Sequence, residues 1–140
     1  MNAALLSFGD IVRYHKTVLR FVGIKKATGS TNPEEYEAIY NGAYAVQALV
    51  NDESIEPVEI TPEFLENNGF EAFNGLNERP CWLHKQAGLI LRKDRVVHRL
   101  FEMEVDVAEV GIQGDIRYIH ELQAVLRMIG SVDTALHLDV

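Results

Sequence analysis

The sequence predicts an α+β fold, and three observations lead to that fold class. Apolar residues recur every three or four positions between residues 115 and 130, which is typical of a helix that faces a core. Several earlier segments alternate apolar and polar residues, which is typical of strands. Turn-forming pairs such as Asn-Gly separate these segments. We therefore expect an N-terminal SH3-like small β-barrel or bent sheet, followed by a short helix, a β-hairpin and a C-terminal helix packed on the sheet.

The first strands are predicted on either side of a turn at residues 15–16. Residues 11–14 and 18–24 are rich in Val, Ile, Leu and aromatic side chains, which favours strands, and Gly9 with Asp10 supplies turn chemistry before them. Residues 27–33 are polar and contain Gly, Ser, Asn and Pro, so they are predicted to form a loop.

A second pair of strands is predicted around Asn41 and Gly42. Residues 36–40 and 43–50 flank this pair, and Asn and Gly tolerate the positive φ of a type I′ turn. The alternative for residues 43–50 is a helix, since alanine favours one. With residues 55–60 as a further strand, the segments predict a small, strongly bent sheet.

A short helix is predicted over residues 61–70. Thr61 suits the N-cap, and Pro62 suits the first helical position, where its missing amide hydrogen costs nothing. Gly69 suits the residue after the helix, so Phe70 is expected to fold back onto Leu65. A helix of about two turns is unstable alone in water, so it is expected to be docked.

The second half is predicted to contain one hairpin and the closing helix. Residues 73–80 are predicted to form a loop, and residues 82–91 and 96–107 to form two arms that turn at Lys93 and Asp94. Residues 111–114 contain two glycines that break the strand pattern.

The closing helix is predicted over residues 115–130, with Asp115 as its cap and Gly130 ending it. The tail at 131–140 fits either a further helical turn or an irregular end. The predicted buried stripe consists of Ile119, Leu122, Leu126 and Ile129, widened by Tyr118 and Val125.

Length and composition are those of an ordinary globular protein. The chain has 140 residues, 47% of them hydrophobic, which suffices for a core without disulfides. Its apolar runs are far shorter than the roughly 20 residues that cross a bilayer, and its start lacks an export-signal pattern. Cys81 is the single cysteine, so the cytoplasm of a host cell is the expected location.

We predict two subdomains, an SH3-like β part at residues 1–60 and a helix–hairpin–helix part at residues 61–140, or one continuous domain.

The charges are arranged in blocks, although the net charge is -8. Residues 31–78 carry eleven acidic residues and no basic one, whereas residues 79–100 carry six basic residues and one acidic one. Exposed ion pairs contribute only about 0–1 kcal/mol each, so such blocks matter more for steering partners than for stability. An acidic block could also imitate a nucleic-acid backbone, but a solvated acidic surface is the simpler interpretation.

Three segments resemble one family of proteins. Residues 57–70 (PVEITPEFLENNGF) are similar to a P-I-x-L-T-x-E-W-L-x-x-x-G-F segment, and residues 116–123 (IRYIHELQ) are similar to I-x-Y-V-H-Q-L-Q. Residues 6–12 (LSFGDIV) resemble an L-x-x-G-N-x-V opening. These segments are found together in small uncharacterised proteins encoded by phages and mobile elements of the Bacteroidales. The chain departs from the pattern at Phe64, where that family has Trp, and at Glu121, where it has Gln. The resemblance implies a phage-like genomic setting and a shared fold, and it implies no catalytic residues.

Candidate metal ligands and nucleophiles do not form a known motif. His120 and Glu121 begin like a zinc-protease helix, but position 124 is Ala, where the second His is required. Cys81 and His84, with His98, have a spacing compatible with a metal or a Cys-His nucleophile. A structural zinc site usually needs several thiolates, and only one thiol exists here.

Acidic strand residues offer a second possible chemistry, a metal-dependent hydrolase. Glu102, Glu104 and Asp106 alternate along one predicted strand, and carboxylates can hold a divalent cation. Neighbours on one strand face lie roughly 7 Å apart, so a second strand would have to complete such a site. No phosphate-binding loop or nucleophile-elbow motif occurs, and we expect no cofactor, no metal and no enzymatic activity.

The predicted function is that of a non-catalytic interaction protein of phage or mobile-element origin. It would bind a host or phage protein partner or assemble with itself, and no membrane partner is expected. The alternative is a nucleic-acid-binding accessory protein that uses the basic hairpin at residues 85–99. The candidate partner-binding residues in that hairpin are Lys85, Arg92, Lys93, Arg95 and Arg99.

Overall fold

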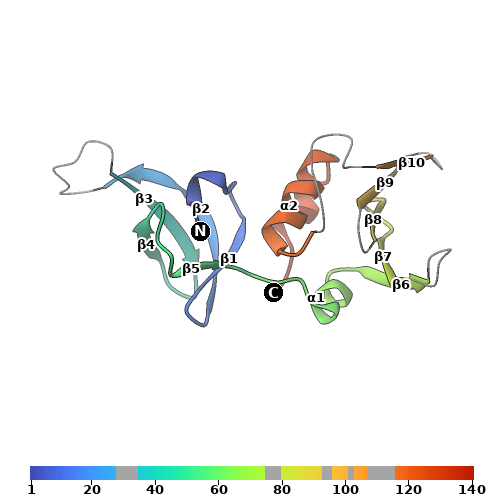
Figure 1. Ribbon diagram of the computed structural model, residues 1–140, viewed down its shortest axis with the longest axis horizontal. Helices are drawn as coiled ribbons and strands as arrows, with labels where there is room; N and C mark the ends of the chain where they lie inside the picture. The colour runs from blue at the N-terminus through green and yellow to red at the C-terminus, as the bar shows by residue number, and fades with distance from the viewer. Residues whose placement is uncertain (28–34, 75–79, 93–95, 101–102, 107–115) are drawn as a thin grey trace. The chain divides into compact units, whose positions relative to one another are not determined.

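The computed structural model describes residues 1–27, 35–74, 80–92, 96–100, 103–106 and 116–140 (Figure 1). They form two compact units, Met1–Val58 and Glu59–Val140. Each unit contains one antiparallel five-stranded sheet, and the described helices are short, so the predicted α+β class is confirmed. The predicted division into subdomains of residues 1–60 and 61–140, or one continuous domain, stays a prediction. The predicted turn at residues 93–94, the glycine pair in 111–114, Glu102 and the cap at Asp115 lie outside the described residues.

The first unit is a five-stranded antiparallel sheet in the order β4-β3-β2-β1-β5. The turn predicted at residues 15–16 is confirmed, and His15 adopts a positive φ of 53° there. The elements are the 3-10 helix η1 (Ala3–Leu5), β1 (Ile11–Tyr14), β2 (Thr17–Lys26), β3 (Tyr36–Gly42), β4 (Val46–Leu49) and β5 (Ile55–Pro57).

This sheet is open and contains a bulge. Its register shifts between Phe21 and Gly23 in the long strand β2, and such bulges bend a strand and increase its twist. The edge strands β4 and β5 do not pair with each other in the described part of the chain, so a closed barrel is not formed there. The predicted closed barrel is therefore not confirmed, and the strongly bent sheet stays a prediction.

The predicted turn at Asn41 and Gly42 is wrong. Both residues belong to β3, where they lie opposite Arg20 and Leu19 of β2, and Gly42 does not have a positive φ. The chain turns over residues 43–45 instead, before β4. The helical alternative for residues 43–50 is wrong as well, because β4 pairs with β3 through Tyr40 and Val46.

Gly42 is required for a close approach of backbones, and this gives a first prediction. A Cβ atom at position 42 would lie 2.7 Å from the carbonyl oxygen of Val18 and 2.9 Å from Cδ2 of Leu19. Because the nearer obstacle is backbone, Gly42→Ala is expected to destabilise the protein by about 1–3 kcal/mol. Gly23→Ala is the matched control, since nothing lies within 4 Å of its added Cβ. Urea denaturation followed by far-ultraviolet circular dichroism measures both, and equal midpoints for the two variants would contradict the prediction.

The core of the first unit lies on one face of its sheet. Tyr40 is fully buried, and its ring contacts that of Phe21 edge-on at a centroid distance of 5.8 Å. The residues of this core are Ala3, Val12, Leu19, Phe21, Ala38, Tyr40, Val46, Ala48 and Ile55.

The second unit contains a meander of five strands in the order β10-β9-β8-β7-β6. The loop predicted at residues 73–80 is wrong at both ends, because β6 (Phe70–Asn74) and β7 (Pro80–His84) pair as a hairpin. The predicted hairpin exists where β8 (Leu89–Leu91) pairs with β9 (Val96–Leu100). Its arms are interrupted, since a turn at residues 85–88 separates β7 from β8, and β9 pairs with a separate strand, β10 (Met103–Asp106).

The helix α1 (Pro62–Asn67) has the predicted ends. The hydroxyl of Thr61 accepts a hydrogen bond from the amide of Phe64 at 3.1 Å, and Gly69 has a positive φ of 83°. Phe70 begins β6 and is buried, so the chain passes directly from the helix into the sheet.

The helix α2 (Ile119–Met128) carries most of the predicted apolar stripe, because Ile119, Leu122, Val125 and Leu126 are buried. Tyr118 and Ile129, the other predicted members, cap the two ends of the helix and are half-buried. It begins four residues later than predicted, with Tyr118 at the N-cap, and the predicted end at Gly130 has a positive φ of 86°. The tail forms a short helix, α3 (Val132–Leu136). The buried amide of Gln123 donates to the carbonyl of Ala135 at 2.9 Å and joins the two helices. The predicted packing of α2 on a sheet stays a prediction.

Candidate functional site

The basic residues predicted to bind a partner lie partly beside acidic residues. The Nζ atom of Lys85 is 3.2 Å from Oε2 of Glu71, and both side chains are exposed. Arg99 of β9 lies opposite Glu104 of β10 in the sheet register. Arg92 follows β8 and is half-buried. Lys93 and Arg95, the two other predicted members, lie outside the described residues.

Cys81 and His84 do not face each other. They are three residues apart in β7, so they project from opposite faces of the sheet. Cys81 is buried with Ile90 and Val97. No group of three His, Cys, Asp or Glu side chains able to hold a metal ion occurs in the portion of the chain that the structure describes.

His84 has a structural environment. Its Nδ1 atom accepts a hydrogen bond from the amide of Ala87 at 3.1 Å, and its ring contacts the ring of Phe70 at a centroid distance of 4.9 Å. Burial of the ring lowers the pKa of His84 below its usual value of 6.5, although hydrogen bonding to backbone opposes this effect. His84 is therefore held in its neutral form at neutral pH, as part of the turn between β7 and β8.

Other residues considered as metal ligands or catalytic groups belong to α2 and β10, not to β7. His120 lies on α2, and its ring stacks on that of Tyr118 at a centroid distance of 5.9 Å. Glu104 and Asp106 belong to β10, opposite Arg99 and Val97. The sheet register therefore places a basic residue, and no second carboxylate, directly across from Glu104.

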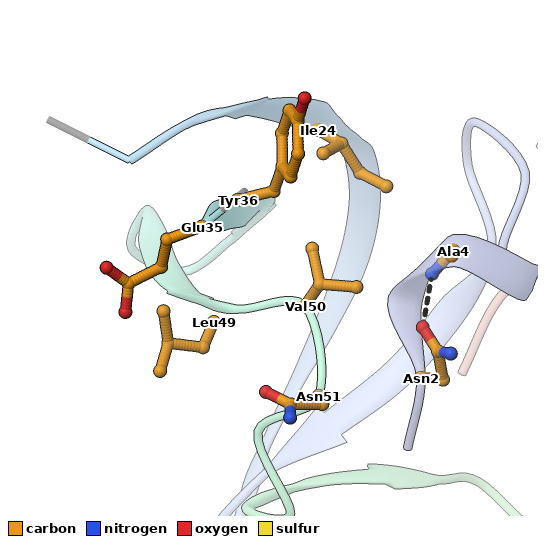
Figure 2. A pocket seen from close by; sticks show the side chains of 8 residues that line it. All are labelled: Asn2, Ala4, Ile24, Glu35, Tyr36, Leu49, Val50 and Asn51. Atoms are coloured by element: carbon orange, nitrogen blue, oxygen red, sulfur yellow. Dashed lines mark hydrogen bonds between the residues drawn. The ribbon is translucent and has the colours of Figure 1, made fainter. Parts of the chain in front are cut away.

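A pocket of about 650 Å³ lies in the first unit, where β2, β3 and β4 meet (Figure 2). This volume is in the range of pockets that bind small molecules. Its lining residues come from the start of the chain, the end of β2, the start of β3 and the end of β4. They are Asn2, Ala4, Ile24, Glu35, Tyr36, Leu49, Val50 and Asn51.

Backbone pairing brings these segments together. The amide of Val50 donates to the carbonyl of Tyr36 at 3.2 Å, and the amide of Ala3 donates to the carbonyl of Val50 at 2.7 Å. Ile24 lies opposite Ala38 and therefore shares its sheet face. Ala38 is buried in the core of this unit, whereas Leu49 lies opposite Glu37 on the other face of the sheet. The pocket therefore lies across the end of the sheet, with lining residues from both faces.

The pocket combines exposed apolar side chains with polar groups at its ends. Ile24, Tyr36 and Leu49 are 44%, 48% and 43% exposed, although each is large and apolar or aromatic. Figure 2 shows Tyr36 and Ile24 at one end of the pocket, and Asn2 with Asn51 at the other. The lining thus combines apolar and polar side chains, a combination also found in sites that bind part of a partner molecule.

The sequence contained a partial signal for this pocket. The alternation of Tyr36, Ala38 and Tyr40 predicts that all three share one sheet face, and the structure buries Ala38 and Tyr40 on that face. Tyr36 stands at the strand end, where the core stops, so it stays exposed. Ile24, Leu49 and Val50 could not be associated with it before the register was known.

A smaller pocket of about 360 Å³ in the second unit is lined by residues that hydrogen bonds hold in place. The side-chain amide of Asn68 donates to the carbonyls of Phe64 and Asp139, both at 2.8 Å, and its oxygen accepts from the amide of Asp139 at 2.7 Å. These polar groups fasten residues 137–139 to the end of α1, since His137 and Asp139 also line the pocket.

Within the described ranges, every helix is too short or too polar to cross a membrane. Comparisons of the chain with protein-family models, with curated proteins and with solved structures found no match.

Proposed function

We propose that this protein is a non-catalytic interaction protein, and that the pocket of its first unit receives an apolar side chain of a protein partner. The observation that supports the proposal is the cluster of exposed apolar side chains at Ile24, Tyr36 and Leu49 around a pocket of about 650 Å³. Tyrosine is enriched at binding hot spots because it offers a large, rigid apolar surface and a polar hydroxyl.

The finer parts of the proposal concern fold and setting. The strand order β4-β3-β2-β1-β5 places the first and last strands side by side, with a long bulged second strand, and this supports an SH3-like unit that is open at the pocket end. The partner belongs to a host cell or to a phage, and the protein acts in the cytoplasm of that host. This setting rests on the resemblance of residues 57–70 and 116–123 to the phage and mobile-element proteins.

Peptide selection tests the proposal. The purified full chain is used to enrich peptides from a random display library, and the affinities of synthetic versions are then measured by calorimetry. Tyr36→Ala is expected to weaken binding at least tenfold, about 1.4 kcal/mol, because it removes the largest side chain of the pocket.

Tyr44→Ala is the matched control for that measurement. Tyr44 is 47% exposed, almost the same fraction as Tyr36, but its hydroxyl hydrogen-bonds to that of Thr17 at 3.3 Å and it does not line the pocket. Its replacement is expected to change affinity by less than about twofold. Peptides that bind both variants equally well, or a failure to enrich any peptide, would refute the proposed function.

A further inference from the structure

The outer edge of β4 has backbone groups directed away from the sheet. In an antiparallel pair, hydrogen-bonded residues alternate with residues whose amide and carbonyl groups point outward. The bond from Val50 to Tyr36 sets this alternation, so Gln47 and Leu49 are the outward-directed residues of β4. The carbonyl of Leu49 accepts from the amide of Asp52 at 2.9 Å. The amide and carbonyl of Gln47 and the amide of Leu49 are thus placed to pair with a further strand.

Acidic residues occur in the segments that flank β4. Glu35 precedes β3, Glu37 lies within it, and Asp52 and Glu53 follow β4, whereas Glu56 lies in β5 at the other edge of the sheet. Glu37 lies directly opposite Leu49, on the same face of the sheet. Glu37 therefore has Leu49 as its neighbour on the β4 side and Lys25 as its neighbour on the β2 side.

We propose that β4 accepts an extended, basic peptide segment of a partner as an additional strand, with one apolar side chain of that segment in the adjoining pocket. This inference rests on the proposed function and specifies the chemistry of the partner. Main-chain pairing with Gln47 and Leu49 supplies affinity, and the pocket lined by Leu49, Val50 and Tyr36 supplies specificity. Lys or Arg side chains on the segment match the acidic residues beside the edge.

Charge favours a basic peptide over a second copy of this chain as the strand added at β4. A second copy of the chain pairing through β4 would bring two segments of residues 35–58 together, and their like charges would oppose that association. A basic peptide meets no such repulsion.

The test uses a dye-labelled nine-residue peptide that alternates Lys with Val and carries one central Leu, with fluorescence anisotropy on the full chain. Two N-methylated versions block alternate sets of peptide amides, and only one set can face β4. Methylation of one set is expected to weaken binding at least about tenfold, while methylation of the other leaves it within about twofold. A version with Glu in place of Lys is expected to bind at least about tenfold more weakly, and added salt is expected to weaken the basic peptide.

Two variants of the protein complete the test. Gln47→Pro removes the outward amide hydrogen without removing a bond between β3 and β4, whereas Gln47→Ala retains it. Only the proline variant is expected to lose binding about tenfold or more, with circular dichroism melting confirming that both variants fold.

The outcomes separate this inference from the proposed function. Equal effects of the two methylated sets, equal binding of the Glu peptide, or no binding of the basic peptide would each overturn strand addition by a basic segment. If library-selected peptides nevertheless depend on Tyr36, the pocket function stands and only the mode and charge of the partner are refuted. A dimer of the free chain that the basic peptide does not dissociate would also overturn the inference, since a second copy would then occupy the edge.

Discussion

Replacing Leu122 with alanine is expected to lower the free energy of unfolding by about 2–5 kcal/mol. Leu122 is fully buried on α2, within the predicted apolar stripe. The change removes buried methyl groups and leaves a cavity, and both effects destabilise the folded state. The measurement is urea denaturation followed by the fluorescence of Trp82, the single tryptophan, which lies in the same unit.

Met128→Ala serves as the control for Leu122→Ala. Met128 is on the same helix but is 47% exposed, so its truncation is expected to change stability by less than about 0.5 kcal/mol. If the two variants unfold at the same urea concentration, α2 does not contribute its apolar stripe to a core.

Raising the pH from 10 to 12 is expected to destabilise the protein through Tyr40 by about 2–3 kcal/mol. Burial, and secondly the nearby carboxylate of Asp52, raise the pKa of Tyr40 from 10.0 to about 12. Between pH 10 and pH 12, the hydroxyl of Tyr40 therefore stays protonated in the folded state, whereas it is ionised in the unfolded chain. The stabilisation is complete below pH 10 and is lost as the pH rises toward 12, at about 1.4 kcal/mol per pH unit.

Tyr40→Phe isolates this contribution. The hydroxyl of Tyr40 is buried and has no hydrogen-bond partner in the described part of the chain, so its removal breaks no bond and is expected to leave stability at pH 7 equal or higher. Urea midpoints measured at pH 8, 10 and 11 should decline less steeply for Tyr40→Phe than for the parent. Tyr44→Phe, which alters an exposed tyrosine, should keep the parent's slope, and a parent slope in Tyr40→Phe would show that this phenol is not the responsible group.

Features determined by neighbouring residues were predicted well. The ends of α1 follow from Thr61, Pro62 and Gly69, because capping and positive φ are local properties of the chain. The turn between β1 and β2 and the buried stripe of α2 were predicted for the same reason, since each depends on short-range spacing.

Features that depend on distant partners were predicted poorly. Asn41 and Gly42 have the composition of a turn, but the position of β2 makes Gly42 a point of close backbone contact instead. Residues 73–80 were predicted to form a loop, because nothing local shows that residues 70–74 pair with residues 80–84. Strand pairing decided both positions, and a single sequence does not reveal register.

The pocket, too, depends on distant strand pairing and could not be predicted from neighbouring residues. The pocket joins Ile24, Tyr36 and Val50, which become neighbours only through the pairing of β2, β3 and β4. Cys81 and His84 were considered as a possible pair because the predicted strand began at residue 82 and did not include Cys81. Both residues belong to β7, where residues three apart project to opposite faces.

The burial of Cys81 has a practical consequence for following local opening. A thiol reagent can reach this side chain only when the sheet of the second unit opens, because Cys81 is 3% exposed between Ile90 and Val97. Since the chain has no other cysteine, the rate of alkylation in native buffer reports that opening at one defined position. The alkylation rate of Cys81 therefore measures local opening of this sheet without an engineered label.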